Sequence, residues 1–275
     1  MPDLPADVEE TIRRALGEDL GSGDVTTEAV VPADATARGA LVAKEDGVVA
    51  GLDVAARVFR MVEPETSVRP TAADGDRVGP ARVLMEVDGA AGSLLTAERV
   101  ALNFLTHLSG IATLTRDYVN ACAGTESVIL CTRKTLPGLR ALERYAVEVG
   151  GGVLHRAGLY DAILIKDNHV AIAGGVAEAV ARATSTGMPV EVEVDTLEQF
   201  REALDAGAAR ILLDNPDVDT VKRAVDLVGD RVPLEVSGGM TVERVREIAG
   251  LGRLSISVGR ITHSAPALDI GLELG

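Results

Sequence analysis

From residue 128 to residue 258 the sequence alternates between short apolar runs and longer amphipathic runs. The apolar runs predict strands at 128–131, 162–166, 190–194, 210–214, 234–237 and 254–258. The runs between them predict helices at 138–149, 174–186, 196–206, 217–228 and 241–249. Such alternation is typical of βα units on a parallel sheet. About six strands are visible, fewer than a closed (β/α)8 barrel has, so we predict an incomplete, open α/β barrel.

The chain before this region follows a different pattern. It predicts a helix at 7–17, a glycine-rich loop after it, broken strands over 36–51, a helix at 52–62 and a strand at 82–87. Ser93 is a candidate N-cap for a long helix that bends or ends at Gly110, with a second helix from Ile111 to Ala121. We therefore predict a smaller α+β domain at 1–109 and a barrel domain at 110–263.

Composition excludes several classes of protein. The formal net charge of −15 argues against nucleic acid and anionic membrane surfaces as partners. No apolar run is long enough to span a membrane, and the acidic N-terminus lacks the apolar core of a signal peptide. The two cysteines form no metal or redox motif, so we expect reduced thiols in a cytoplasmic protein.

Cationic side chains follow the first two predicted barrel strands. Arg133 and Lys134 end the first strand, Lys166 ends the second, and His155 and Arg156 follow a glycine break between them. The carboxyl ends of parallel strands form the ligand face of such a scaffold. Because clustered cations repel one another, we expect a ligand with several negative charges.

The alternative is a set of solvated charges with ion pairs along a helix. We adopt it for Arg140 and Arg144, which lie inside the predicted helix together with Glu143. Strand-end positions favour a functional role for the other cations.

Carboxylates mark the next two strands. Glu191, Glu193 and Asp195 share one face of a strand, where they need the strand-end cations or a metal ion as partners. Asp214 ends the following strand, and capping of the next helix is its alternative role.

Glycine-rich turns follow the last two strands. Ser237, Gly238 and Gly239 follow one, and Gly259 follows the other. Backbone N–H groups of such turns bind phosphate, often after the final strands of a barrel.

Several ordered motifs resemble those of the quinolinate phosphoribosyltransferase family, the carboxylating nicotinate-nucleotide pyrophosphorylases. They are EDLG-x-GD-x-T at 18–26, ERVALN at 98–103, LSGIAT at 108–113, TRKT-x-PGLR at 132–140, GGG-x-x-HR-x-GL-x-D at 150–161 and LIKDNH at 164–169. The chain departs from the family pattern at Cys131 and Leu154, where Asp and Asn are common. The resemblance implies the open barrel and a tail, 264–275, that returns to the N-terminal domain.

The resemblance also implies a reaction and its residues. Quinolinate and phosphoribosyl diphosphate would give nicotinate mononucleotide, CO2 and diphosphate, a step of de novo NAD biosynthesis. Glu193 and Asp214 would be catalytic together with Lys134, and the two acids would face Mg²⁺ bound mainly by the diphosphate. The implied substrate-binding residues are Arg99, Arg133, Lys134, His155, Arg156, Lys166, Ser237, Gly238, Gly239 and Gly259. Arg99 would reach into the partner's site in a homodimer, or in a hexamer built as a trimer of dimers.

Three alternatives stay open on the residues alone. A divergent paralog would act on another heteroaromatic carboxylate. A Schiff-base aldolase would use Lys166, a lysine at the end of a barrel strand. A protein that binds polyanions without catalysis would need the cations but not the acids.

Overall fold

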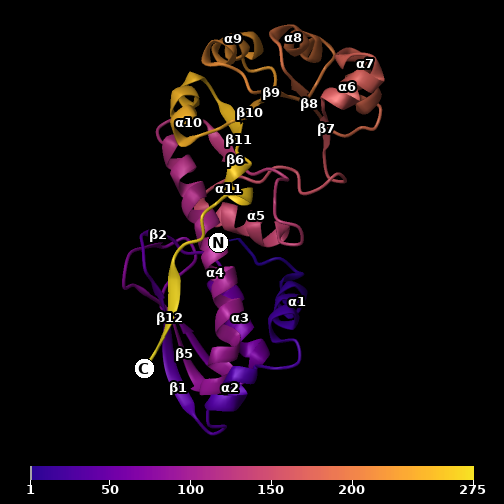
Figure 1. Cartoon of the computed structure of the whole chain (residues 1–275). Helices are drawn as coiled ribbons and strands as arrows, with labels where there is room; N and C mark the ends of the chain where they lie inside the picture. The colour runs from indigo at the N-terminus through magenta and orange to yellow at the C-terminus, as the bar shows by residue number, and fades with distance from the viewer. Residues whose placement is uncertain (1) are drawn as a thin grey trace. The chain divides into compact units, whose positions relative to one another are not determined.

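The computed structural model describes residues 2–275, and the chain divides into two compact units (Figure 1). The first unit combines the chain up to Arg116 with Thr135–Gly151 and Ile261–Gly275. The second unit combines Asp117–Lys134 with Gly152–Arg260. The segment 135–151, which we predicted within the barrel domain, is therefore grouped with the N-terminal part of the chain.

The second unit is built on a six-stranded sheet in which every neighbouring pair is parallel. The sheet order is β6-β11-β10-β9-β8-β7, and no ladder among residues 2–275 joins β6 to β7. The strands are β6 (Val128–Leu130), β7 (Ile163–Ile165), β8 (Val190–Val194), β9 (Arg210–Asp214), β10 (Leu234–Ser237) and β11 (Leu254–Ser257). All six predicted strands are found, and the predicted open α/β barrel is confirmed.

Helices follow the strands along the outer side of this sheet (Figure 1). They are α6 (Asp167–Ala173), α7 (Val176–Thr184), α8 (Leu197–Asp205), α9 (Val218–Val228), α10 (Val242–Ile248) and the 3₁₀ turn η1 (Ala249–Leu251). Thr196, Asp217 and Thr241 cap α8, α9 and α10 by accepting a backbone N–H. Helix α6 was not predicted, because its residues follow Lys166 directly and none of them is buried.

The first unit contains a four-stranded antiparallel sheet in the order β12-β1-β5-β3 and a two-stranded pair, β2-β4. Its elements are α1 (Val8–Leu20), α2 (Val25–Val30), β1 (Thr36–Ala43), β2 (Gly47–Val48), α3 (Leu52–Val62), β3 (Ser67–Pro70), β4 (Arg77–Val78), β5 (Val83–Ala90), α5 (Arg140–Gly150) and β12 (Ile270–Leu274). Helices α4 (Ala91–Ala121) and α11 (Arg260–His263) each include residues of both units. The C-terminal strand β12 pairs with β1, so the tail completes the N-terminal sheet.

Two predictions in this unit were wrong. Asp24 caps a short helix, α2, where we expected only a loop. Helix α4 is continuous from Ala91 to Ala121, so Ser93 is not its N-cap and Gly110 does not break it. A Cβ at Gly110 would collide with the Pro266 carbonyl oxygen. The glycine therefore allows the tail to approach the helix closely.

Both cysteines are buried, and within residues 2–275 neither forms a disulfide. Among residues 2–275, no helix combines the length and the apolar character that crossing a membrane requires.

Candidate active site

Lys166 and Glu193 form an ion pair at the carboxyl ends of two neighbouring strands. Lys166 follows β7 directly, and Glu193 is the penultimate residue of β8. The distance from Lys166 Nζ to Glu193 Oε2 is 2.6 Å, and the two side chains are 46% and 17% exposed. The expectation that Glu193 needs a cation is therefore met by Lys166. Because the pair is open to solvent, either partner can exchange it for a ligand group.

Asp214 ends β9 and is held by two hydrogen-bond donors. Ser237 Oγ donates to Oδ1 at 2.6 Å, and Asn215 Nδ2 donates to Oδ2 at 2.7 Å. The alternative role of Asp214 as a helix cap is wrong, because Asp217 caps α9 by accepting the Thr220 N–H. The Asp214 carboxylate thus remains at the strand end, with lone pairs left for a ligand.

The turn after β10 contains two glycines in a left-handed backbone conformation. Gly238 and Gly239 adopt φ values of 90° and 57°, in the left-handed region that favours glycine. Thr241 caps the short helix α10 that follows. The phosphate role of Ser237, Gly238 and Gly239 stays a prediction, as does that of Gly259. The Ser237 hydroxyl itself points to Asp214.

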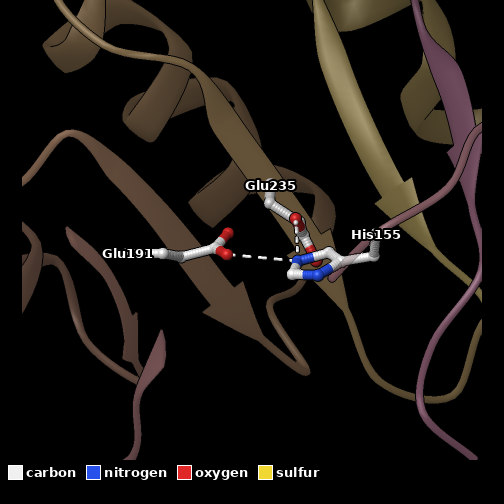
Figure 2. Close-up of side chains that lie close together, drawn as sticks. All are labelled: His155, Glu191 and Glu235. Atoms are coloured by element: carbon white, nitrogen blue, oxygen red, sulfur yellow. Dashed lines mark ion pairs between the residues drawn. The ribbon is translucent and has the colours of Figure 1, made fainter. Parts of the chain in front are cut away.

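A second group of ionisable side chains meets around two buried glutamates, Glu191 on β8 and Glu235 on β10 (Figure 2). His155 Nε2 is 3.1 Å from Glu191 Oε2 and 3.2 Å from Glu235 Oε2. Ser257 Oγ donates to Glu235 Oε1 at 2.6 Å, and Arg210 Nη1 lies 3.4 Å from Glu235 Oε2. Arg210 Nε is also 4.0 Å from Glu191 Oε1, so both carboxylates face the same two cationic groups.

Burial and charge act against each other in this group. Burial acts to lower the pKa of His155, but hydrogen bonds and the negative charges of Glu191 and Glu235 raise it to about 9. Burial raises the pKa of Glu191. His155 Nδ1 also accepts the Arg156 N–H at 2.7 Å, which suits an imidazole that has its proton on Nε2. An imidazolium with two carboxylates, or an imidazole with one protonated glutamic acid, contains the same number of protons.

The three ligating atoms of this group lie within 4.8 Å of one another, so a metal ion has to be considered. Their separations of 3.1 and 3.2 Å are those of hydrogen bonds. The extra proton and Arg210 already balance the charge of the two carboxylates, and a divalent cation would add positive charge beside Arg210. We therefore assign the group as a buried ion-pair network.

This network changes the interpretation of His155. Its Nε2 faces two carboxylates and its Nδ1 faces a backbone N–H, so both ring nitrogens contact protein groups in this structure. The sequence analysis found Glu191 but missed Glu235 and Arg210. The only signal for Glu235 was an acid inside the apolar strand Leu234–Ser237.

Two of the remaining predicted cations of the second unit, Arg133 and Arg156, are close enough to influence one another. The pKa of Arg156 is lowered by burial and by the positive charge of Arg133, while Glu191 and Glu193 act to raise it. Arg156 Nη1 also donates to the Ala162 carbonyl at 3.3 Å. Lys134 is exposed beside Arg133. Of the predicted crowding of like charges, the influence of Arg133 on Arg156 is present, and an anionic ligand would relieve it.

The first unit contains Arg99 and a buried carboxylate. Arg99 is exposed on α4, and within residues 2–275 no hydrogen bond or ion pair engages its side chain. Glu143 is fully buried, 2.9 Å from His107 Nε2, and it accepts the Leu136 N–H. It is therefore not the exposed helical ion-pair partner that we expected.

Two family models match the chain in sequence order. "Quinolinate phosphoribosyl transferase, N-terminal domain" matches residues 24–109, and the C-terminal domain of the same family matches residues 111–273. This chain belongs to the quinolinate phosphoribosyltransferase family.

Individual relatives agree with the family models over nearly the whole chain. Nicotinate-nucleotide pyrophosphorylase [carboxylating] of Mycobacterium leprae is 49% identical over 96% of this chain and 96% of its own length. NadC from Streptococcus pyogenes, a crystal structure, is 41% identical, with a TM-score of 0.95 over 100% of this chain and 99% of that one. The Francisella tularensis nicotinate-nucleotide pyrophosphorylase is 36% identical, again with a TM-score of 0.95, over 99% of this chain and 98% of that one.

Proposed function

We propose that this chain transfers the phosphoribosyl group of phosphoribosyl diphosphate to quinolinate and releases CO2, giving nicotinate mononucleotide for de novo NAD biosynthesis. The observation that carries the proposal is membership of the quinolinate phosphoribosyltransferase family over almost the full length. It is supported by the cations and carboxylates at the strand ends, which suit a dianionic acceptor and a cationic transition state.

Quinolinate binding is assigned to the crowded cations. Arg133, Arg156 and Lys134 supply positive charge, and guanidinium groups bind carboxylates through paired hydrogen bonds. Lys166 joins them when it leaves Glu193. His155 belongs to the buried network, and its Nδ1 accepts a hydrogen bond from the Arg156 N–H. It therefore positions the backbone of Arg156.

The reaction requires no general base. The pyridine nitrogen attacks C1 of the ribose, the new C–N bond forms, and the bond from C1 to the diphosphate oxygen breaks. Positive charge develops on the ribose, and Glu193 and Asp214 stabilise it electrostatically. The C2 carboxylate then leaves as CO2, and its electron pair remains beside the positively charged ring nitrogen until water protonates that carbon.

Mg²⁺ fits the two strand-end acids. Carboxylate oxygens are ligands that Mg²⁺ prefers, and the ion is held in large part by substrate phosphates. When bound, it neutralises the diphosphate as this group departs. Both oxygens of Asp214 accept one hydrogen bond each, which leaves further lone pairs.

The functional unit that we propose is a homodimer with shared active sites, alone or within a hexamer, in the cytoplasm. Arg99 is exposed on α4 and has no hydrogen-bond or ion-pair partner among residues 2–275, which supports a contact in another subunit. Two buried cysteines that form no disulfide within residues 2–275 suit a reducing compartment. The test mixes inactive Arg99→Ala with inactive Lys134→Ala chains, differently tagged to demonstrate exchange. Mixed dimers should regain activity at one intact site, and inactive mixed dimers would contradict the shared site.

The reaction itself is tested by incubating the protein with phosphoribosyl diphosphate, Mg²⁺ and either quinolinate or nicotinate. Nicotinate mononucleotide should form from quinolinate and only slowly from nicotinate, because nicotinate lacks the second carboxylate that these cations would bind. Omitting Mg²⁺ should stop turnover. Equal rates with both acids would overturn the two-carboxylate assignment, and no product from quinolinate would favour a divergent paralog or a protein that only binds polyanions.

The aldolase alternative is disfavoured by the surroundings of Lys166. Its amine is ion-paired with Glu193 and close to half exposed. A Schiff-base lysine is instead desolvated in an apolar pocket or activated by a second cation.

A further inference from the structure

The Asp214 carboxylate is fixed at both of its oxygen atoms. Ser237, its direct neighbour across the β9–β10 pair, donates to Oδ1, and Asn215 donates to Oδ2. Bound at one oxygen, a carboxylate can still rotate about its last bond. Bound at both, it presents its remaining lone pairs in fixed directions.

The backbone of Asn215 is strained in order to make this contact. Its φ of 49° is one of only two positive values among the non-glycine residues in the part of the chain that the structure describes. Asn also precedes Pro216, and a residue before proline is normally pushed towards extended conformations. The strained conformation is stabilised by the Asn215 N–H, which donates to the Ser237 carbonyl at 2.9 Å. Strain of this kind is retained where the surrounding structure requires it, often at functional sites.

The turn after β10 provides the space for the Asn215 side chain. A Cβ on Gly238 would overlap Oδ1 and Cγ of Asn215. Gly238 therefore has a role beyond its φ, because any larger residue would push the amide away from Asp214. Asp214–Asn215 and Ser237–Gly239 are far apart in sequence, but their side chains and backbone contact one another at the ends of β9 and β10.

We propose that Asn215 is a positioning residue that, together with Ser237, aims the free lone pairs of Asp214 at the magnesium-bound diphosphate donor. Gly238 is glycine in part to admit the Asn215 amide. This inference rests on the proposed function, because it takes Asp214 as the acid that faces phosphoribosyl diphosphate. The sequence predicted neither the Asn215–Asp214 contact nor the close approach of Asn215 to Gly238, whose predicted role was phosphate binding.

Two substitutions at Asn215 separate the amide from the backbone. Asn215→Gly keeps access to the left-handed conformation and removes the amide. Asn215→Asp keeps the shape but places a second carboxylate beside Asp214. Loss of such an orienting contact typically lowers metal affinity or activity by about 10- to 100-fold. We expect that loss in kcat/KM for phosphoribosyl diphosphate with Asn215→Gly, and a larger one with Asn215→Asp. The Mg²⁺ concentration for half-maximal rate should rise, with KM for quinolinate and the urea unfolding midpoint unchanged.

Ala81 supplies a matched control, since it is the other non-glycine residue with positive φ and lies in the first unit. Ala81→Gly should leave kcat/KM and the Mg²⁺ dependence as in the unmodified protein. Wild-type kinetic values in Asn215→Gly would overturn the positioning role while the proposed function stands.

Calorimetry distinguishes this failure from failure of the proposed function. Phosphoribosyl diphosphate with Mg²⁺ is titrated into the unmodified protein and into Asn215→Gly, without quinolinate. If the unmodified protein binds the donor but never forms nicotinate mononucleotide, the proposed reaction is wrong. In that case, weaker binding by Asn215→Gly still supports the positioning role and equal binding overturns it. If neither protein binds the donor and the unmodified protein forms no nicotinate mononucleotide, both proposals are wrong.

Discussion

Strand β8 contains two glutamates, Glu191 and Glu193, that share a face but meet opposite environments. The Glu193 side chain is 17% exposed and pairs with the half-exposed Lys166. The Glu191 side chain is 9% exposed and pairs with His155, itself 12% exposed. The type of a residue and the strand on which it lies therefore do not determine what its side chain does. Glu193, at the strand end, can exchange Lys166 for a ligand. Glu191, two residues earlier in the strand, is held in a buried network.

The same division appears on β10, where the buried Glu235 precedes the partly exposed Ser237. We call the first group the buried set and the second group the strand-end set. The buried set is His155, Glu191 and Glu235, and the strand-end set is Lys166, Glu193, Asp214 and Ser237. The comparison predicts that substitutions in the buried set impair folding and that those in the strand-end set impair turnover.

Glu235→Ala should have the largest effect. It removes a carboxylate that is 1% exposed and leaves His155 with Glu191 alone, and breaking such a buried pair costs about 3–5 kcal/mol. Urea denaturation should show this loss in the free energy of unfolding. Glu86→Ala is the control, because its partner Arg69 is exposed and such pairs contribute about 0–1 kcal/mol. Equal losses of unfolding free energy in Glu235→Ala and Glu86→Ala would show that the buried network contributes no more to stability than a surface ion pair.

Asp214→Ala should lower turnover by at least about 100-fold through lost electrostatic stabilisation, and Glu193→Ala should do the same. Steady-state kinetics would measure kcat, and quinolinate binding followed by calorimetry should be nearly unchanged. Near-normal kcat in both variants would show that these acids are structural. The strand-end set would then not differ in role from the buried set.

The buried set should also make stability depend on pH. Because the pKa of His155 is raised from 6.5 to about 9, its contribution is complete below pH 6.5 and is lost as pH rises through 9. We expect a loss of about 1–2 kcal/mol between pH 7 and pH 10, after allowing for solvent screening. Glu191→Gln should flatten this profile. A profile that keeps its slope in the variant would show that another group titrates.

The strands of the second unit could be predicted because a parallel sheet buried on both faces requires continuous apolar runs, such as Ile211–Leu213. The strand-end residues were predictable for the same reason, since each follows such a run. Helix α6 was missed because it buries no residue and therefore has no apolar periodicity. The continuity of α4 was missed because the reason for Gly110 lies at Pro266, more than a hundred residues later in the chain.

The partners of the buried acids were beyond sequence reasoning for a related reason. Glu191 meets Glu235 and Arg210 only through the register of β8, β9 and β10. The Asn215 contact likewise depends on a left-handed backbone and on an absent Cβ across the sheet. Local patterns predicted which residues lie at the strand ends but not which side chains hold them there.

The division between the two sets is tested most directly by making one substitution at both glutamates of β8. For Glu191→Gln and Glu193→Gln, kcat with quinolinate and the free energy of unfolding in urea would be measured side by side. Glu193→Gln should lose most of its turnover, by about tenfold or more, and keep its stability. Glu191→Gln should lose stability and keep kcat within about threefold, a difference below 1 kcal/mol. Loss of turnover in Glu191→Gln at full stability, or equal effects in both variants, would contradict the account.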